Sequence, residues 1–137
     1  MSDRVKGTMM TDPARVARIA RDLCGQFPQQ ESFWVLCLNT RNICTTVRMI
    51  SLGTIDRTPV HPREIFRPAI MDSAKSIIIF HCHPSNDPAP SQADIDVTKT
   101  LVEAGKIVGI DVKDHVVVGM DMDEPLRFVS LREKGWM

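Results

Sequence analysis

Short apolar segments and segments with helical spacing alternate along this chain. Runs rich in β-branched and other apolar residues predict five strands, at residues 31–38, 43–50, 76–80, 110–118 and 128–130. The polar residues 39–42 between the first two runs predict a β-hairpin. The third run is apolar without interruption from Ile77 to Phe80, which predicts a strand that is buried on both faces.

Three segments between these strands have the start signals of helices. Asp12 followed by Pro13 predicts a helix that ends before Gly25, and Pro62 predicts a second helix to about residue 71. A third helical pattern opens at Ser91. Helices interleaved with strands predict an α/β fold, in which a mixed β-sheet is flanked by helices.

Two histidines directly follow the buried third strand. Residues two apart on a strand share a face, so His81 and His83 can point at one metal ion while Cys82 points to the opposite side, into the core. Asp94 follows in the first turn of the third helix, where a carboxylate is favoured. Two histidines and one carboxylate leave a fourth coordination position for water. An open position of this kind is typical of a catalytic zinc site and not of a structural one.

Other interpretations of these residues remain open from spacing alone. Ser91 and Asp94 also fit a helix-capping box, which needs no metal. Asp87 follows the histidines closely and competes with Asp94 as the third ligand. It ranks lower because an aspartate in a turn commonly bonds its own backbone.

The spacing of these residues is similar to the motif of a known enzyme family. His81-x-His83, seven intervening residues, Ser91, two residues and Asp94 resemble the H-x-H-x(7)-S-x(2)-D motif of the JAMM (MPN+) metallopeptidases. Residues 30–130 also resemble the bacterial RadC branch of that family. The further matching residues are Gly53-Thr54, the block 60–66, Pro84-Ser85, Thr98 and Asp114-His115. The resemblance implies a three-layer sandwich of the JAMM and cytidine-deaminase type.

The resemblance also implies a chemistry and a domain organisation. JAMM enzymes are zinc-dependent hydrolases of peptide or isopeptide bonds. One Zn²⁺ per chain is therefore implied, with His81, His83 and Asp94 as ligands, a glutamate as general acid/base and Ser91 as stabiliser of the tetrahedral intermediate. We expect an N-terminal helical segment (residues 1–30) before a catalytic domain (residues 31–137), in a single domain overall. Residues 1–30 are too few for the helix-hairpin-helix module that RadC-like proteins often carry, so a stand-alone catalytic domain is expected.

The general base must lie outside the motif, because a ligand such as Asp94 cannot easily also relay protons. Glu31 and Glu64 are the candidates. Glu31 opens the first apolar strand, and it resembles the JAMM glutamate that precedes such a strand. Glu64 follows Pro62 and fits an ordinary helix start. We therefore predict Glu31 as the base.

Five further residues bear on the predicted site. Cys82 and Asn86 stand where RadC-like proteins usually have Asn and Gly, but Asn tolerates a positive φ, so neither departure removes a ligand. The pair Asp114-His115 either lines the site or is a structural pair in which the histidine bonds its neighbour. Arg63 could seat a substrate carboxylate, although an exposed arginine at a helix start is the commoner case.

Composition and charge narrow the class of protein. The chain has 137 residues, of which 43% are hydrophobic and 25% charged, as expected for one domain with its own core. Seventeen basic and seventeen acidic residues give a formal net charge of zero, so charge offers no reason to expect tight nucleic-acid binding. The four cysteines form no C-x-x-C pair and are expected to be reduced core residues. No secretion signal or run of about 18 apolar residues is present, which predicts a cytoplasmic protein without a membrane span.

The sequence thus predicts a zinc-dependent metallopeptidase or isopeptidase that acts on a peptide or an isopeptide-linked protein. The alternative is a DNA-repair-associated accessory protein or a metal-dependent nuclease with the same metal site, because RadC-like proteins carry a DNA-repair label. A zinc deaminase is disfavoured, since the H-x-E…P-C-x-x-C signature is missing. The sequence does not predict an oligomeric state.

Overall fold

The computed structural model describes residues 5–53 and 60–137. Residues 1–4 of the predicted N-terminal segment and Thr54 of the family resemblance lie outside the described residues. The elements, in chain order, are α1 (Pro13–Cys24), β1 (Ser32–Leu38), β2 (Cys44–Leu52), α2 (Pro62–Met71), β3 (Ser76–His83), α3 (Gln92–Val108), β4 (Asp111–Gly119) and β5 (Phe128–Ser130). These elements confirm the order of strands and helices that the hydrophobic pattern predicts.

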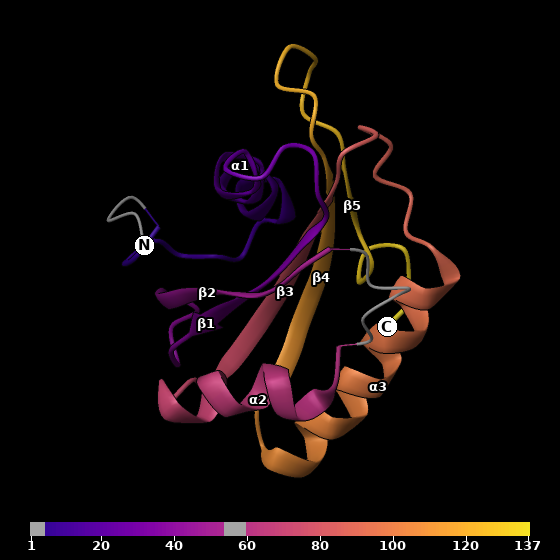
Figure 1. Ribbon diagram of the computed structural model, residues 1–137. Coiled ribbons are helices and arrows are strands. Elements are labelled where there is room, and N and C mark those ends of the chain that lie inside the picture. The colour runs from indigo at the N-terminus through magenta and orange to yellow at the C-terminus, as the bar shows by residue number, and fades with distance from the viewer. Residues whose placement is uncertain (1–4, 54–59) are drawn as a thin grey trace.

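The five strands form one mixed sheet in the order β2-β1-β3-β4-β5. β3 and β4 are parallel, and the other neighbouring pairs are antiparallel. Helix α1 covers one face of the sheet, and α2 and α3 cover the other face (Figure 1). This arrangement confirms the predicted α/β fold with three layers.

The central strands are buried on both faces because each face carries its own core. Every residue of β1 is buried, and β3 is buried up to Cys82. On the face of α1, Trp34 stacks on Phe80 with the ring centroids 5.7 Å apart. On the face of α2 and α3, Ile77 and Ile79 pack with Leu101. A strand between two apolar layers needs no polar face, which explains the unbroken apolar run.

All three helices begin where the sequence signals predict, and α1 and α2 also end at the predicted residues. The Asp12 side chain accepts a hydrogen bond from the Ala14 N–H at 3.0 Å, which caps α1. α2 begins at Pro62 and continues through Pro68, and α3 ends at Gly109 with a left-handed φ of 78°. Among residues 5–53 and 60–137, no helix is both long enough and apolar enough to cross a bilayer.

The structure corrects the prediction that all four cysteines are reduced. Cys24, at the end of α1, forms a disulfide with Cys82 of β3, with the two Cα atoms 6.4 Å apart. Cys37 and Cys44 are free and buried, as expected. Cys82 does point away from its two histidine neighbours and towards α1, which confirms that part of the prediction. The pairing spans 58 residues and depends on how α1 packs against the sheet, so no local spacing could reveal it.

Candidate metal centre

The end of β3 and the start of α3 bring three potential ligands together. His81 and His83 share the face of β3 that looks towards α3, and Asp94 lies in the first turn of that helix. His81 Nε2 lies 3.0 Å from His83 Nε2 and 3.3 Å from Asp94 Oδ1. His83 Nε2 lies 3.6 Å from Asp94 Oδ2. Both His81 and Asp94 are buried, whereas the His83 side chain is 12% exposed.

These atoms fit a metal ion better than they fit one another. Two ligand atoms about 2.0–2.2 Å from a tetrahedral zinc ion lie about 3.3–3.6 Å apart, close to the distances between the three donors. Asp94 Oδ1 is buried and accepts no hydrogen bond from the residues that the structure describes; His81 Nε2, at 3.3 Å, pairs with it only when that ring is protonated. A buried oxygen without a donor is costly unless a cation neutralises it. The group His81, His83 and Asp94 could therefore hold a metal ion.

The two oxygens of Asp94 have different tasks. Oδ2 accepts a hydrogen bond from the Ser91 N–H at 2.8 Å, and Ser91 Oγ accepts one from the Asp94 N–H at 3.1 Å. The capping box that spacing left open is therefore present. It does not compete with a metal role, because it fixes the carboxylate with Oδ1 3.3 Å from His81 Nε2 and Oδ2 3.6 Å from His83 Nε2. The Ser91 hydroxyl accepts in this box, so its own hydrogen is not used there.

The charges of the site favour a cationic occupant. Burial alone would raise the pKa of Asp94, but the neighbouring imidazoles of His81 and His83 outweigh burial and hold the pKa far below its usual range. Burial would likewise lower the pKa of His83. Hydrogen bonds to Asp94 and to the Asp87 carbonyl, together with the charge of Glu31, raise that pKa instead. The site thus attracts a proton when no metal is bound, and a metal ion would have to displace it.

Glu31 lies next to the metal group, on the side that is open to solvent. Its Oε1 lies 3.9 Å from His83 Nε2, and its side chain is 28% exposed. Together with Gly53, His83 and Ser85 it lines an open groove of about 520 Å³. A carboxylate that is close to the metal ligands and reachable from solvent has the position that a proton relay needs.

Three other sequence candidates, Asp87, Glu64 and Arg63, do not belong to the group that could hold a metal ion. The Asp87 carboxylate accepts a hydrogen bond from the Ala89 N–H at 3.0 Å, as an aspartate in a turn does. Its main-chain carbonyl instead accepts from His83 Nδ1 at 2.9 Å, so that in the neutral ring the lone pair is on Nε2, which faces the metal group. Glu64 and Arg63 both line a different groove, between α2 and β2.

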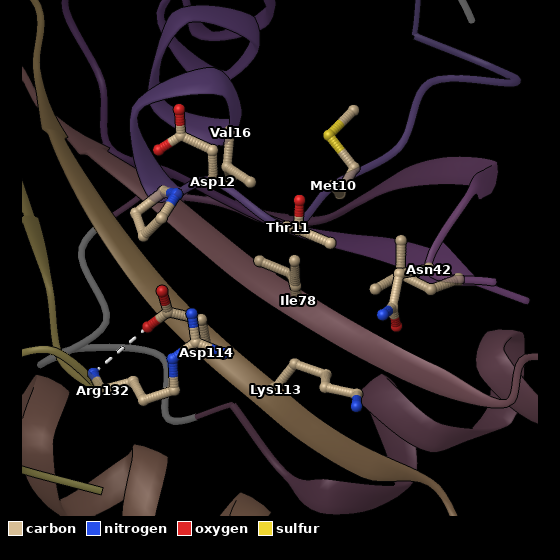
Figure 2. Close-up of a pocket in the computed structure, with 11 residues that line it drawn as sticks. Met10, Thr11, Asp12, Val16, Asn42, Ile78, Lys113, Asp114 and Arg132 are labelled. Carbon is tan, nitrogen blue, oxygen red and sulfur yellow. Dashed lines mark hydrogen bonds between the residues drawn. The ribbon is translucent and has the colours of Figure 1, made fainter. Parts of the chain in front are cut away.

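Asp114 and His115 form a structural pair through the main chain, because the His115 N–H donates a hydrogen bond to Asp114 Oδ1 at 2.7 Å, but their side chains point to opposite sides of the sheet. Asp114 points to the α1 side, where it lines a small cavity and accepts a hydrogen bond from the Arg132 N–H at 3.2 Å (Figure 2). His115 points to the opposite side, where its Nε2 lies 2.8 Å from His81 Nδ1. Burial, and then the charge of His81, lowers the pKa of His115. Because the side chains of neighbouring strand residues point to opposite faces, the side chains of Asp114 and His115 cannot both line the metal group.

Thr98 is a residue of this region to which sequence analysis gave no chemical role. It is fully buried on α3, and its hydroxyl contacts both the Asp94 carbonyl and His115 Nδ1. The available signal was a polar residue on the otherwise apolar face of a helix, one turn after Asp94.

The turn after His83 depends on Asn86 and Gly119. Asn86 has the positive φ predicted for it, 65°, and its side chain accepts a hydrogen bond from the Asp121 N–H at 3.1 Å. Gly119, the partner of His83 in the pairing of β3 with β4, lies directly against the Asn86 main chain. A Cβ atom on Gly119 would overlap the carbonyl oxygen of Asn86. This close approach helps to keep the Asp87 carbonyl in place for His83.

We expect Gly119→Ala to destabilise the protein by about 1–3 kcal/mol, the usual cost of forcing extra volume into a packed site. Its zinc affinity should also fall, because the displaced turn carries the carbonyl that orients His83. Chemical denaturation and a chelator competition assay measure the two effects. Gly25→Ala is the control: Gly25 has an ordinary φ of −59°, and an added Cβ would lie 3.2 Å from the Asp22 carbonyl oxygen, which needs only a small shift, so the free energy of unfolding should change by less than about 1 kcal/mol. Equal stability of the two variants would contradict the prediction.

Comparison with known proteins agrees with this geometry. A family model described as the RadC-like JAB domain matches residues 10–136. A UPF0758 protein of Methanosarcina barkeri is 44% identical over 109 residues, which are 80% of this chain and 45% of that protein. A UPF0758 protein of Bacillus mycoides is 50% identical over 110 residues, which are 80% of this chain and 47% of that protein. The chain thus spans about half the length of these relatives. With its HxH strand end, its Asp94 helix start and a match along nearly its whole length, the chain belongs to the RadC-like JAB domain family.

Proposed function

We propose that this protein is a zinc-dependent hydrolase of peptide or isopeptide bonds, with His81, His83 and Asp94 as the metal ligands. One observation carries the proposal. Three donor atoms converge on a point where Asp94 Oδ1 lacks any other described partner, and a solvent-reachable carboxylate, Glu31, stands beside them. Nitrogen and oxygen donors in such a set suit zinc. The family resemblance supports the same chemistry.

A bound zinc ion would supply Lewis acidity to a scissile carbonyl and lower the pKa of a water molecule. Glu31 takes a proton from the attacking water, whose oxygen bonds to the carbonyl carbon. When the carbon–nitrogen bond breaks, Glu31 returns the proton to the leaving amine, so that protons balance. Glu31 Oε1 lies 3.9 Å from His83 Nε2, so this carboxylate is beside the group that would hold the metal, although it is not one of the three grouped residues.

The hydroxyl hydrogen of Ser91 is available to stabilise the oxyanion that forms when water attacks the carbonyl. Its hydroxyl oxygen accepts from the Asp94 N–H, so its hydrogen can be donated to the oxyanion that develops on the carbonyl. The capping box holds the hydroxyl within the same turn as a metal ligand. We therefore assign Ser91 to the stabilisation of the tetrahedral intermediate.

The substrate that we propose is a peptide or an isopeptide-linked protein, and the groove beside Glu31 and His83 would receive it. The groove is open at the surface, so a substrate chain could lie across it. Cytoplasmic location remains a prediction.

A cleavage assay tests the function directly. We expect a library of peptide and isopeptide substrates to contain some that the zinc-loaded protein cleaves, and we expect a chelator to abolish and added zinc to restore cleavage. The same samples should bind labelled duplex and single-stranded DNA only weakly and in a salt-sensitive way, because the net charge is zero. Submicromolar DNA binding at physiological salt, together with no zinc-dependent cleavage of any peptide, would overturn the proposal. Metal-dependent nicking of DNA would keep the site and change the substrate class.

A further inference from the structure

His115 is a fully buried imidazole that the proposed reaction does not use. It lies on β4, its ring centroid is 4.9 Å from that of His81, and it makes an edge contact with Phe33. Its two ring nitrogens face different partners: Nδ1 faces the Thr98 hydroxyl, and Nε2 faces His81 Nδ1. The hydrogen atoms along this line of contacts can be assigned from what each partner is able to donate.

The assignment starts at Thr98. A hydroxyl has one hydrogen, and a main-chain carbonyl can only accept. Thr98 Oγ1 lies 2.7 Å from the Asp94 carbonyl oxygen, so it donates its hydrogen there. In the contact between Thr98 and His115, the hydrogen must therefore come from the ring. His115 consequently carries its hydrogen on Nδ1.

The assignment then passes to His81. Neither nitrogen of His115 faces a carboxylate, and the ring is fully buried, so it is neutral and its Nε2 holds a lone pair. His115 Nε2 can therefore only accept in its 2.8 Å contact with His81 Nδ1, and the hydrogen of that contact must come from His81. His81 thus carries its hydrogen on Nδ1, and its Nε2 lone pair faces His83 and Asp94.

We propose that Thr98 and His115 are positioning residues that hold His81 in the tautomer able to bind the metal through Nε2. The line of hydrogen bonds begins at the Asp94 carbonyl and ends at the metal group, to which Asp94 also gives its carboxylate. These hydrogen bonds therefore connect His81 on β3 to Asp94 on α3. They fix both the ring orientation and the tautomer of His81. Hydrogen-bond partners of this kind commonly set metal affinity. The inference rests on the proposed metal site.

A purely structural role for His115 would predict a different response to substitution at Thr98. If His115 only fills space next to Phe33, removing the Thr98 hydroxyl should leave the metal site unchanged. In the proposed arrangement, Thr98→Val removes the acceptor of His115 Nδ1–H. His115 then favours a hydrogen on Nε2, which points at His81 and forces the His81 hydrogen onto its own Nε2. That tautomer has no lone pair for the metal.

The experiment combines nitrogen NMR of labelled histidines with zinc competition. The chain has four histidines, so the ring signals are few enough to assign. In the wild-type protein, both metal-free and zinc-loaded, we expect His115 to carry its hydrogen on Nδ1. In Thr98→Val we expect it on Nε2, with zinc affinity lowered about 10–100-fold, whereas Thr98→Ser should keep the wild-type tautomer and affinity. Thermal unfolding of the metal-free variants checks that the fold is intact.

Two results would overturn the inference: a wild-type His115 protonated on Nε2, or a folded Thr98→Val protein with wild-type zinc affinity. If the wild-type protein bound no zinc at all, the proposed function would fail. The tautomer of His115 in the metal-free protein would still decide the hydrogen-bond assignment, so the two failures are distinguishable.

Discussion

The purified protein is expected to bind about one zinc ion per chain, and His83→Ala is expected to abolish this binding. In the proposed site His83 is one of three protein ligands among the described residues, so its loss should cost more than the roughly 10–100-fold that loss of an outer hydrogen-bond partner costs. Affinity should also fall as the pH is lowered, because zinc must displace the proton favoured by the raised pKa of His83. Elemental analysis and chelator competition measure both effects.

Two aspartates serve as a matched pair for the third ligand. Asp94→Asn should weaken zinc binding, because an amide lacks the charge of the buried carboxylate, while its side-chain oxygen can still accept from the Ser91 N–H. Asp87→Asn should retain zinc, since the side chain of Asp87 bonds only to its own turn in the described contacts. Zinc retention in Asp94→Asn together with zinc loss in Asp87→Asn would instead identify Asp87 as the third ligand. Full zinc retention in both His81→Ala and His83→Ala would rule out the site.

Glu31→Gln is expected to keep the fold and the zinc but to lower hydrolysis by about 100-fold or more, the usual contribution of a general acid/base. Glutamine has nearly the same shape as glutamate, but its amide cannot take a proton from water near neutral pH. Since Glu31 is not among the three grouped ligands, zinc content should stay at the wild-type level. Cleavage rates at saturating zinc, measured beside the zinc content of the same samples, give the comparison.

Glu64→Gln is the control for this substitution. Glu64 lies in the first turn of α2 and lines the groove between α2 and β2, away from the metal group. Its replacement should change the cleavage rate much less than that of Glu31. A greater loss in Glu64→Gln than in Glu31→Gln, with zinc intact in both, would show that the general base had been assigned to the wrong glutamate.

Local sequence patterns were sufficient to predict the elements of the fold. The uninterrupted apolar run before His81 predicts a doubly buried strand, and β3 lies between two apolar layers as expected. The helix signals at Asp12 and Pro62 also match the starts of α1 and α2. These patterns are informative because capping, proline geometry and strand burial act over only a few neighbouring residues.

The grouping of His81, His83 and Asp94 was also predictable, since it depends on one strand, one turn and the first turn of one helix. Period-two alternation puts the histidines on one face, and the cap at Ser91 orients the aspartate. The sequence could not choose between a capping box and a ligand for Asp94. In the structure the two roles are compatible, because Oδ2 takes part in the capping box while Oδ1 makes no hydrogen bond to the described residues and could bind a metal ion.

Contacts between distant segments were decided only by the tertiary structure. The Cys24–Cys82 disulfide, the approach of Glu31 to His83 and the contact of His115 with His81 join residues that lie 58, 52 and 34 positions apart. Such contacts depend on how α1 packs and how β1, β3 and β4 pair in the sheet, which no local spacing encodes. By itself the sequence determined the elements and a compact ligand motif, because these follow from short-range geometry. Which distant side chains complete the site depended on the packing of layers around the sheet.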